Sequence, residues 1–535
     1  MKIRLVHGAG PALELEAASG TLLSRAIWLS GRIEPLPLCA GLGRCGLCRV
    51  RFLRDPPPPL PEEEARLTFE DLAQGWRLAC RRQIFDDSAP LDLELSLGIS
   101  PDISDASSVA LPEEIKTAKD IPLLLAVDVG TTSVQWRALA AIGKNRGKTT
   151  ARGAFLNPQA GAGADVMSRL AFAVKPEGRH TLSDLIRASL RRVIERLAGK
   201  TGRVEFVCLA ANTAMTDIFL ERDVSGLCAA PYRLGHNGHE TVRPPDLPPV
   251  YIPPLPAPFV GGDAACALLA LLHAGTSRPF VLADLGTNAE MALVTKAGEI
   301  FMTSVPLGPA LEGIGMECGC LAGPDAVTRF SLTPAGLAPF AAGLARGISA
   351  TGYISLLALL RRLDLLDESG HFIAPEACVM PLARRIAAGL VRERGRLRLP
   401  LPGGLWLSAV DVEEVLKVRA AFVLALEKLL AAGGVAAGEV ARLCLAGALG
   451  EHVIIEDLVT LGFVPPGPEV LPVGNAALDG AALLALQPKK GKGLARICRK
   501  ARLIFPAQER SFQREYLERI AFPVQGRQWE QPWSS

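Results

Sequence analysis

The sequence predicts a small α+β domain at the N-terminus, followed by a larger α/β region. Three observations lead to this fold class. Short segments of alternating apolar and polar residues crowd the first hundred positions, which is typical of strands in a small sheet. From Ile121 onward, apolar strand-like runs alternate with helical patterns, as in α/β proteins. Two similar segments, Asp128–Thr132 (DVGTT) and Asp284–Asn288 (DLGTN), each follow an apolar run and form a weak, short internal repeat.

Composition narrows the class of protein. The chain has 535 residues, of which 49% are hydrophobic and 21% charged, so it can bury large cores and is not disordered. The net charge of +3 argues against a general nucleic-acid binder. No apolar run reaches the roughly 18 residues of a membrane span. Met1–Gly8 alternates like a strand and does not resemble a signal peptide, so we expect a cytoplasmic protein.

The first domain is predicted to span residues 1–98. A helix is expected at Thr21–Ser30, ending at a glycine. Residues 99–120 are polar and rich in Ser and Asp, which indicates a linker. The alternating segments predict strands at Lys2–Val6, Leu13–Glu16, Arg49–Leu53 and Leu91–Leu97.

The region from Ile121 contains both kinds of element. Eight prolines in Pro244–Pro258 predict an irregular surface loop. Seven Lys or Arg residues in Lys489–Arg502 indicate the basic surface of a folded element, with docking of an acidic partner as the alternative. Strands are expected at Leu123–Val127, Phe206–Ala210 and Pro279–Ala283, and helices at Leu182–Leu197 and Val412–Ala432.

Four of the 12 cysteines lie in the first domain with a metal-ligand spacing. Cys39, Cys45 and Cys48 form a C-x5-C-x2-C loop, and Cys80 is a distant fourth thiol. Three thiolates from one loop and one from elsewhere is a common arrangement for an iron–sulfur cluster. Structural zinc more often uses two C-x2-C pairs. The spacing therefore favours a 2Fe–2S cluster, with zinc as the alternative.

The cysteine loop resembles that of adrenodoxin-like ferredoxins, and Arg77–Cys80 (RLAC) resembles their fourth-ligand segment. This resemblance covers residues 1–98 and implies a β-grasp fold. Gly41, Gly43 and Gly46 permit positive φ angles and close approach of backbone N–H groups to the sulfurs. Arginines around the loop are either ordinary solvated charges or a docking site for an acidic redox partner; they are Arg44, Arg49, Arg51, Arg54, Arg77, Arg81 and Arg82.

The two similar segments, Asp128–Thr132 and Asp284–Asn288, have the chemistry of phosphate-binding loops. Gly130 and Gly286 allow close approach of the backbone to a phosphate. Asp128 and Asp284 are candidates for the water shell of Mg²⁺. Hydroxyl and amide donors come from Thr131, Thr132, Thr287 and Asn288.

This pair of loops resembles the acetate/sugar kinase–Hsp70–actin superfamily, in which two related lobes clamp ATP. The resemblance implies a two-lobed ATPase with a first lobe at 121–270 and a second at 271–535. In Leu443–Gly450 (LCLAGALG), Gly447 matches the adenosine-side glycine. Asp263 or Glu290 could orient the attacking water, although a structural or indirect magnesium role is the stronger interpretation for each.

A ferredoxin domain joined to such an ATPase resembles the reductive activators of corrinoid proteins, and further segments match that family. The chain departs from it at 347–352 and 409–410, where nucleotide contacts are in doubt, and it lacks the C-terminal cysteine runs of activators with 4Fe–4S clusters. The matching segments include Asn157–Gln159 (NPQ), Gly163–Arg169 (GADVMSR), Asn212–Met215 (NTAM), Phe259–Asp263 (FVGGD), Gly308–Gly313 (GPALEG), Val473–Ala481 (VGNAALDGA) and Phe522–Pro523.

The resemblance implies an ATP-hydrolysing activator with Mg²⁺ that passes one electron from a 2Fe–2S cluster to Co(II) cobalamin, giving Co(I). Its partners are then a corrinoid protein of a methyltransferase system and an upstream low-potential electron donor, and the family suggests a homodimer. The alternative is a small-molecule kinase with a ferredoxin domain as redox regulator. Cys318 and Cys320 are either small residues in a tight turn or ligands of a bridging 4Fe–4S cluster.

Overall fold

The computed structural model describes residues 1–6, 12–36, 38, 41, 43, 46–85, 90–95, 121–308, 310, 315–343, 345–393 and 395–523. The predicted linker at 99–120 lies outside these residues. The chain divides into two compact units. The first comprises Met1–Cys266 and Ala477–Cys498, and the second Ala267–Ala476 and Arg499–Ser535.

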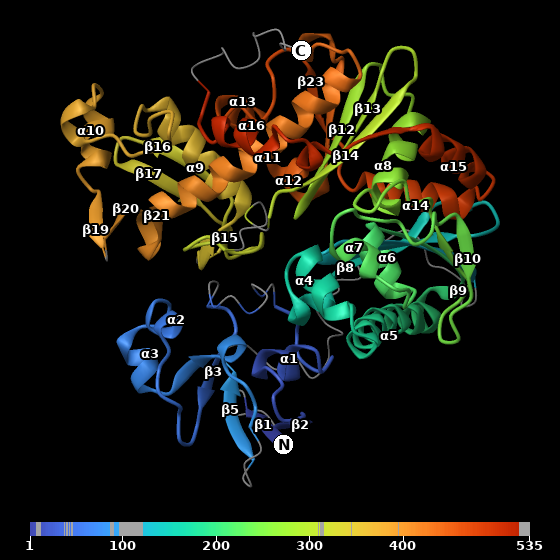
Figure 1. Ribbon diagram of the computed structural model, residues 1–535, viewed down its shortest axis with the longest axis horizontal. Helices are drawn as coiled ribbons and strands as arrows, with labels where there is room; N and C mark the ends of the chain where they lie inside the picture. The colour runs from blue at the N-terminus through green and yellow to red at the C-terminus, as the bar shows by residue number, and fades with distance from the viewer. Residues whose placement is uncertain are drawn as a thin grey trace. The chain divides into compact units, whose positions relative to one another are not determined.

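The N-terminal residues form a five-stranded sheet in the order β2-β1-β5-β3-β4 (Figure 1). Strand β1 pairs antiparallel with β2 and parallel with β5, and Leu5 and Leu93 face the same core. This mixed order is that of a β-grasp fold, as predicted. The elements are β1 (Lys2–Val6), β2 (Leu13–Glu16), α1 (Leu23–Trp28), β3 (Arg49–Phe52), α2 (Pro61–Glu64), α3 (Phe69–Ala73), β4 (Trp76–Leu78) and β5 (Leu91–Leu95).

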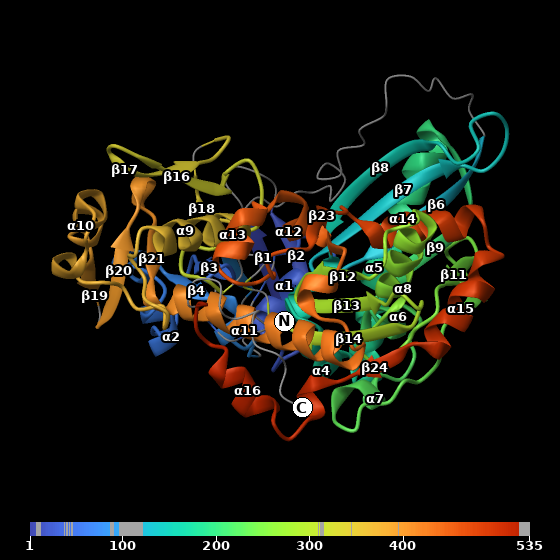
Figure 2. The ribbon, with the colours of Figure 1, turned by 90° about the horizontal axis from the view of Figure 1, so that it is seen from above.

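The rest of the first unit is built on a six-stranded sheet in the order β10-β11-β9-β6-β7-β8. Strand β6 is apolar along most of its length because helices and neighbouring strands bury it. Figure 2 shows β6, β7 and β8 side by side. The strands are β6 (Ile121–Val129), β7 (Ser133–Ala140), β8 (Thr149–Leu156), β9 (Gly202–Ala211), β10 (Glu240–Val242) and β11 (Val250–Ile252). The helical segments are η2 (Pro158–Ala162), α4 (Val166–Ala173), α5 (Pro176–Lys200), α6 (Thr213–Phe219), α7 (Ser225–Cys228) and α8 (Gly262–His273).

The second unit repeats this strand pattern. Its six-stranded sheet has the order β23-β22-β12-β13-β14-β24. As β6 does in the first sheet, β12 pairs antiparallel with the following strand on one side and parallel with a later strand on the other. The strands are β12 (Phe280–Leu285), β13 (Asn288–Val294), β14 (Ile300–Pro306), β22 (Arg442–Ala446), β23 (Glu469–Pro472) and β24 (Arg502–Ile504). The short motif that recurs in the sequence at Asp128 and Asp284 therefore corresponds to a duplicated sheet topology.

Helices and small sheets complete the second unit around its own apolar core. The long helix α11 begins at a capping box in which Ser408 and Asp411 bind each other's backbone N–H groups. The helices are α9 (Ala350–Arg362), α10 (Pro381–Ala387), α11 (Ala409–Ala432), α12 (Gly447–His452), α13 (Ile455–Thr460) and α16 (Phe512–Glu518). The small strands are β15 (Ala326–Val327), β16 (Arg329–Thr333), β17 (Gly336–Phe340), β18 (Gly347–Ile348), β19 (Val391–Glu393), β20 (Arg396–Pro400) and β21 (Trp406–Ser408).

Two features differ from the sequence-based expectation. The Pro-rich segment 244–258 contains strand β11, whose Val250 and Ile252 are buried, so it is not wholly irregular. Helices α14 (Ala476–Leu486) and α15 (Lys490–Lys500) pack mostly with the first unit, although they come late in the sequence. Within the described part of the chain, no helix has the length and apolar character to cross a bilayer.

Candidate functional site

The first predicted phosphate loop is the tight turn between β6 and β7. A Cβ at Gly130 would lie 2.8 Å from the Ser133 carbonyl oxygen, so the turn requires glycine. Asn157 holds the loop through two hydrogen bonds. Its side-chain amide donates to the Gly130 carbonyl and its backbone N–H to the Thr132 carbonyl, both at 2.8 Å. The guanidinium of Arg169 donates to the carbonyl between them, that of Thr131. All three carbonyl groups of the turn are thus fixed.

Other matched segments meet at the same edge of this sheet. Strands β6 and β9 are parallel, and Asp128 lies opposite Ala210, so Asn212 follows at the same end. The Asn212 side chain caps α6 by accepting the Met215 N–H at 2.9 Å. Gly261, two positions before Asp263, packs against Asn212, because a Cβ added at Gly261 would lie 2.3 Å from the Asn212 Cα atom. The structure therefore brings the segments of Asp128, Asn212 and Asp263 to the same edge of the sheet.

The second predicted loop is the equivalent turn, between β12 and β13. Gly286 donates to the Asn288 carbonyl at 3.1 Å, and the Thr287 carbonyl accepts the N–H groups of Leu307 and Gly308 at 3.0 Å. Asp284 lies directly opposite Glu290 in the antiparallel register. Carboxylate oxygens are ligands that Mg²⁺ prefers in proteins. This pair is a candidate site for Mg²⁺.

Gly447 lies against this loop. Strands β12 and β22 run parallel, and Asp284 pairs with Ala446, so Gly447 follows at the same end of the sheet. Its φ is +84°, and an added Cβ would lie 2.7 Å from the Asp284 Oδ1 atom. Burial raises the pKa of Asp284 from 3.8 to about 6. The predicted adenosine-side glycine and the second loop are therefore neighbours.

Two of the four predicted cluster ligands are described. Cys48 and Cys80 are buried and lie at adjacent ends of β3 and β4, where Ala79 N–H donates to the Cys48 carbonyl at 2.9 Å. Cys39 and Cys45 lie outside the described residues. Gly41, Gly43 and Gly46 have φ angles of +89°, +68° and +69°, as predicted. The described thiols and glycines fit an iron–sulfur cluster held where β3 begins and β4 ends.

Glu63 is a fully buried charge of this domain. Its carboxylate accepts the backbone N–H groups of Leu60 and Leu78 at 2.9 Å and forms an ion pair with Arg82. Because Leu78 and Arg82 flank Cys80, the buried charge holds the segment that carries the fourth thiol.

Most of the described arginines around the loop have an acidic partner inside the domain. Paired arginines are less available to a docking protein. The pairing therefore favours ordinary surface charges over a docking site for an acidic redox partner. The pairs are Arg51–Glu94, Arg54–Asp92, Arg81–Glu62 and Arg82–Glu63, and the buried Arg77 lies 3.9 Å from Glu63.

Cys318 and Cys320 lie in a packed region. The Trp406 N–H donates to the Cys318 sulfur, and a Cβ at Gly347 would lie 2.8 Å from the Cys320 sulfur. Burial raises the pKa of Cys318 to about 12 and that of Cys320 to about 11. The close packing around both sulfurs favours the interpretation as small core residues.

The two departures from the family pattern occupy helix starts. Ser349 caps α9 by accepting the Gly352 N–H, and a Cβ at Gly352 would lie 2.3 Å from the Val327 carbonyl oxygen. Ser408 caps α11 by accepting the Asp411 N–H, and the Asp411 carboxylate accepts the Ser408 N–H and also the Glu317 N–H, the latter at 2.8 Å. Both segments are anchored by local structure.

The segments of Asn157 and Arg169 are recognisable in the sequence only as family matches, with no role that the sequence assigns to either residue. Asn157 carries a signal that can be recognised, because Asn before Pro is a frequent turn residue. A buried Arg169 that binds a loop 38 positions away has no local signal.

Comparisons with known proteins agree with this arrangement. Sequence profiles match the RACo middle region over residues 123–273 and the C-terminal ASKHA domain of RACo over residues 278–531. The corrinoid activation enzyme RamQ of Eubacterium limosum is 26% identical over 391 residues, which cover 68% of this chain and 64% of that enzyme. The [Co(II) methylated amine-specific corrinoid protein] reductase of Methanosarcina barkeri is 25% identical over 75% of this chain and 77% of its own length.

A solved structure has the same fold over almost the whole chain. It is a reductive activator for a corrinoid, iron–sulfur protein, with a TM-score of 0.65 and 22% identity. The similarity covers 97% of this chain and 98% of that one.

Proposed function

Because this chain belongs to the RACo family of reductive activators, we propose that it reactivates a corrinoid protein of a methyltransferase system. In the proposed reaction, one electron leaves a reduced 2Fe–2S cluster and converts Co(II) to Co(I), while ATP is hydrolysed to ADP and phosphate. An upstream low-potential donor then returns an electron to the cluster. The observation that carries the proposal is the match to both RACo regions together with two relatives named for corrinoid activation or reduction.

Cys39, Cys45, Cys48 and Cys80 are the proposed cluster ligands. A 2Fe–2S cluster held by these thiols would supply a one-electron reductant, and such clusters in plant-type ferredoxins have potentials of about −400 mV. The buried positions of Cys48 and Cys80 at neighbouring strand ends support this assignment. The charge of Glu63 keeps the Cys80 segment in place, so that the fourth thiol is presented without rearrangement.

The two turns are the proposed contacts for ATP and Mg²⁺. Turn N–H groups with Thr131, Thr132, Thr287 and Asn288 can bind phosphate oxygens. The facing carboxylates Asp284 and Glu290 support Mg²⁺ at the second turn, and Asp128 is the corresponding carboxylate of the first. Asp263 belongs to a segment at the same edge of the sheet as Asp128 and is proposed to act through water rather than on ATP directly.

ATP can promote an unfavourable electron transfer only by binding some states of the protein more tightly than others. Each 100 mV of unfavourable potential costs about 2.3 kcal/mol for one electron. The proposed role of ATP is therefore conformational, with hydrolysis returning the protein to its starting state.

The experiment is anaerobic. Pre-reduced protein is mixed with a Co(II) corrinoid protein, and Co(I) absorbance is followed with and without Mg-ATP. We expect Co(I) only with Mg-ATP, and its loss in Cys80→Ala but not in the matched variant Cys228→Ala, whose half-buried thiol lies in the first unit away from the cluster domain. ATP turnover that yields a phosphorylated small molecule, with no Co(I) from any corrinoid protein, would instead identify a redox-regulated kinase.

A further inference from the structure

Within the first unit, the β-grasp domain packs directly on the segment that supports the first phosphate loop. The chain after α1 crosses η2 at Gly161. A Cβ added there would lie 2.9 Å from the Trp28 carbonyl carbon and 3.0 Å from the Leu29 Cδ2 atom. Leu29 itself packs against the apolar core of the neighbouring sheet. This contact leaves no room for a methyl group.

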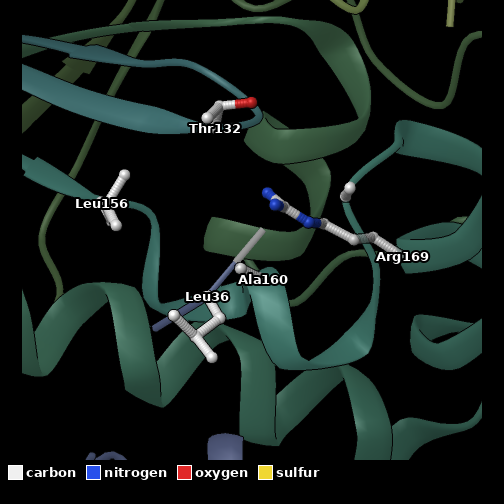
Figure 3. Close-up of a pocket in the computed structure, with 6 residues that line it drawn as sticks. Leu36, Thr132, Leu156, Ala160 and Arg169 are labelled. Carbon is white, nitrogen blue, oxygen red and sulfur yellow. The ribbon is translucent and has the colours of Figure 1, made fainter. Parts of the chain in front are cut away.

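Three further contacts extend this interface. The guanidinium of Arg25 lies over the Phe172 ring at 4.9 Å from its centre. A Cβ at Gly31 would lie 3.0 Å from a methyl group of Leu185. Leu36, three positions before the first predicted cluster ligand, faces a small cavity that is also lined by Thr132 and Arg169 (Figure 3). The interface therefore runs from α1 towards the cysteine loop.

The lobe segments in this interface are those that fix the first loop. Helix η2 begins directly after Asn157, which binds the carbonyl groups of Gly130 and Thr132. Helix α4 carries Phe172 on the interface and Arg169 on the Thr131 carbonyl. Arg169 also donates to the Gly163 carbonyl at 3.0 Å and so ties α4 to the end of η2. Each segment contacts the loop at one end and the β-grasp domain at the other.

We propose that nucleotide binding at the first phosphate loop and seating of the β-grasp domain on η2 and α4 are coupled. The seated domain keeps Asn157 and Arg169 in the positions that shape the loop for phosphate, and bound nucleotide in turn holds the domain seated. The inference rests on the proposed function, because it takes ATP as the ligand of this loop. Close-packed contacts shift between discrete arrangements rather than deforming gradually. One methyl group added at Gly161 is therefore enough to disturb the packing of the β-grasp domain on η2.

Coupling of this kind is reciprocal: the factor by which seating strengthens nucleotide binding is also the factor by which nucleotide strengthens seating. ATP thereby controls how firmly the domain with Cys48 and Cys80 is held.

The test compares two glycine-to-alanine variants of the full-length protein. Gly161→Ala places a methyl group against Trp28, whereas the same change at Gly199 in α5 meets no atom within 4 Å. We expect the Kd for Mg-ATP to rise at least about fivefold in Gly161→Ala and to stay unchanged in Gly199→Ala. Leu29→Ala, which removes a contact instead of adding one, is expected to act in the same direction.

Hydrogen exchange measured by mass spectrometry provides the reciprocal readout. In the wild type, Mg-ATP should slow amide exchange in peptides that cover α1, and this effect should be lost in Gly161→Ala. Equal Kd values for the wild type, Gly161→Ala and Leu29→Ala would overturn the coupling while leaving the proposed function intact. α1 exchange insensitive to Mg-ATP in the wild type would overturn it as well. Absence of Mg-ATP binding in the wild type would reject the proposed function itself.

Discussion

Replacing Asp284 by Asn should stabilise the nucleotide-free protein while removing its response to Mg-ATP. Burial raises the pKa of Asp284 from 3.8 to about 6, so the folded protein binds this proton more tightly than the unfolded chain does. The folding free energy attributable to the group is therefore most favourable below about pH 4 and is lost as the pH rises towards 6. The difference between a pKa of 3.8 and one of about 6 corresponds to at most about 3 kcal/mol.

Thermal unfolding followed by calorimetry measures this effect. For a unit of about 250 residues, 3 kcal/mol corresponds to a rise in Tm of up to about 10 °C. We expect Asp284→Asn to unfold at higher temperature than the wild type at pH 7.5, and the difference to disappear near pH 4. Mg-ATP should raise the Tm of the wild type only, because Mg²⁺ compensates the carboxylate that the variant lacks.

The matched control is Asp325→Asn, which changes an exposed carboxylate of the same unit and should leave the Tm unchanged. A lower Tm for Asp284→Asn at pH 7.5 would refute the argument from charge burial. So would a Tm difference from the wild type that persists unchanged at pH 4, because the cause would then not be ionisation.

Three further predictions concern stability and metal content. Glu63→Gln should lower the unfolding free energy of the β-grasp domain in urea by about 3 kcal/mol, because the buried Arg77 and the half-buried Arg82 lose their counter-charge; the neighbouring change Glu62→Gln, in an exposed pair, should have little effect. Arg419→Met should speed proteolysis near the C-terminus, since the buried guanidinium binds carbonyl groups at 461, 519 and 521; unchanged cleavage would show that these bonds do not hold the segment. Replacing Cys318 and Cys320 together by Ala should leave the iron content per chain unchanged, whereas a loss of iron would support a bridging cluster.

Much of the fold follows from local patterns in the sequence. In the β-grasp domain, the predicted segments Lys2–Val6 and Leu13–Glu16 are strands with the same bounds, because alternation on a half-buried sheet leaves a clear period of two. The helix predicted at Thr21–Ser30 is shorter, Leu23–Trp28, since its ends lack strong caps. The short strand β11 was missed because its three residues lie among prolines, which normally indicate a loop.

The candidate site was less fully predictable. The glycines and carboxylates of the two turns could be found because their chemistry recurs after an apolar strand. The residues that support the turns could not be found in this way. Arg169 binds a carbonyl group far away in the sequence, and Glu290 faces Asp284 only through the strand register. The packing of Gly161 against Trp28 joins residues of different domains, and no local pattern encodes such a contact.

The two turns look alike in sequence but differ in what surrounds them, and this difference suggests a division of roles. In the second turn, Asp284 faces a second carboxylate, Glu290, whereas the equivalent partner of Asp128 in the first turn is the neutral Gln135. Carboxylate oxygens are ligands that Mg²⁺ prefers, and we propose that the cross-strand pair of Asp284 and Glu290 gives the second turn the stronger Mg²⁺ contact. The first turn has instead all three carbonyl groups fixed by a segment that also carries the β-grasp domain. Under the proposed function, the duplicated fold places Mg²⁺ binding on one copy and coupling to the β-grasp domain on the other, so that one nucleotide serves both the proposed hydrolysis and control of the proposed cluster domain.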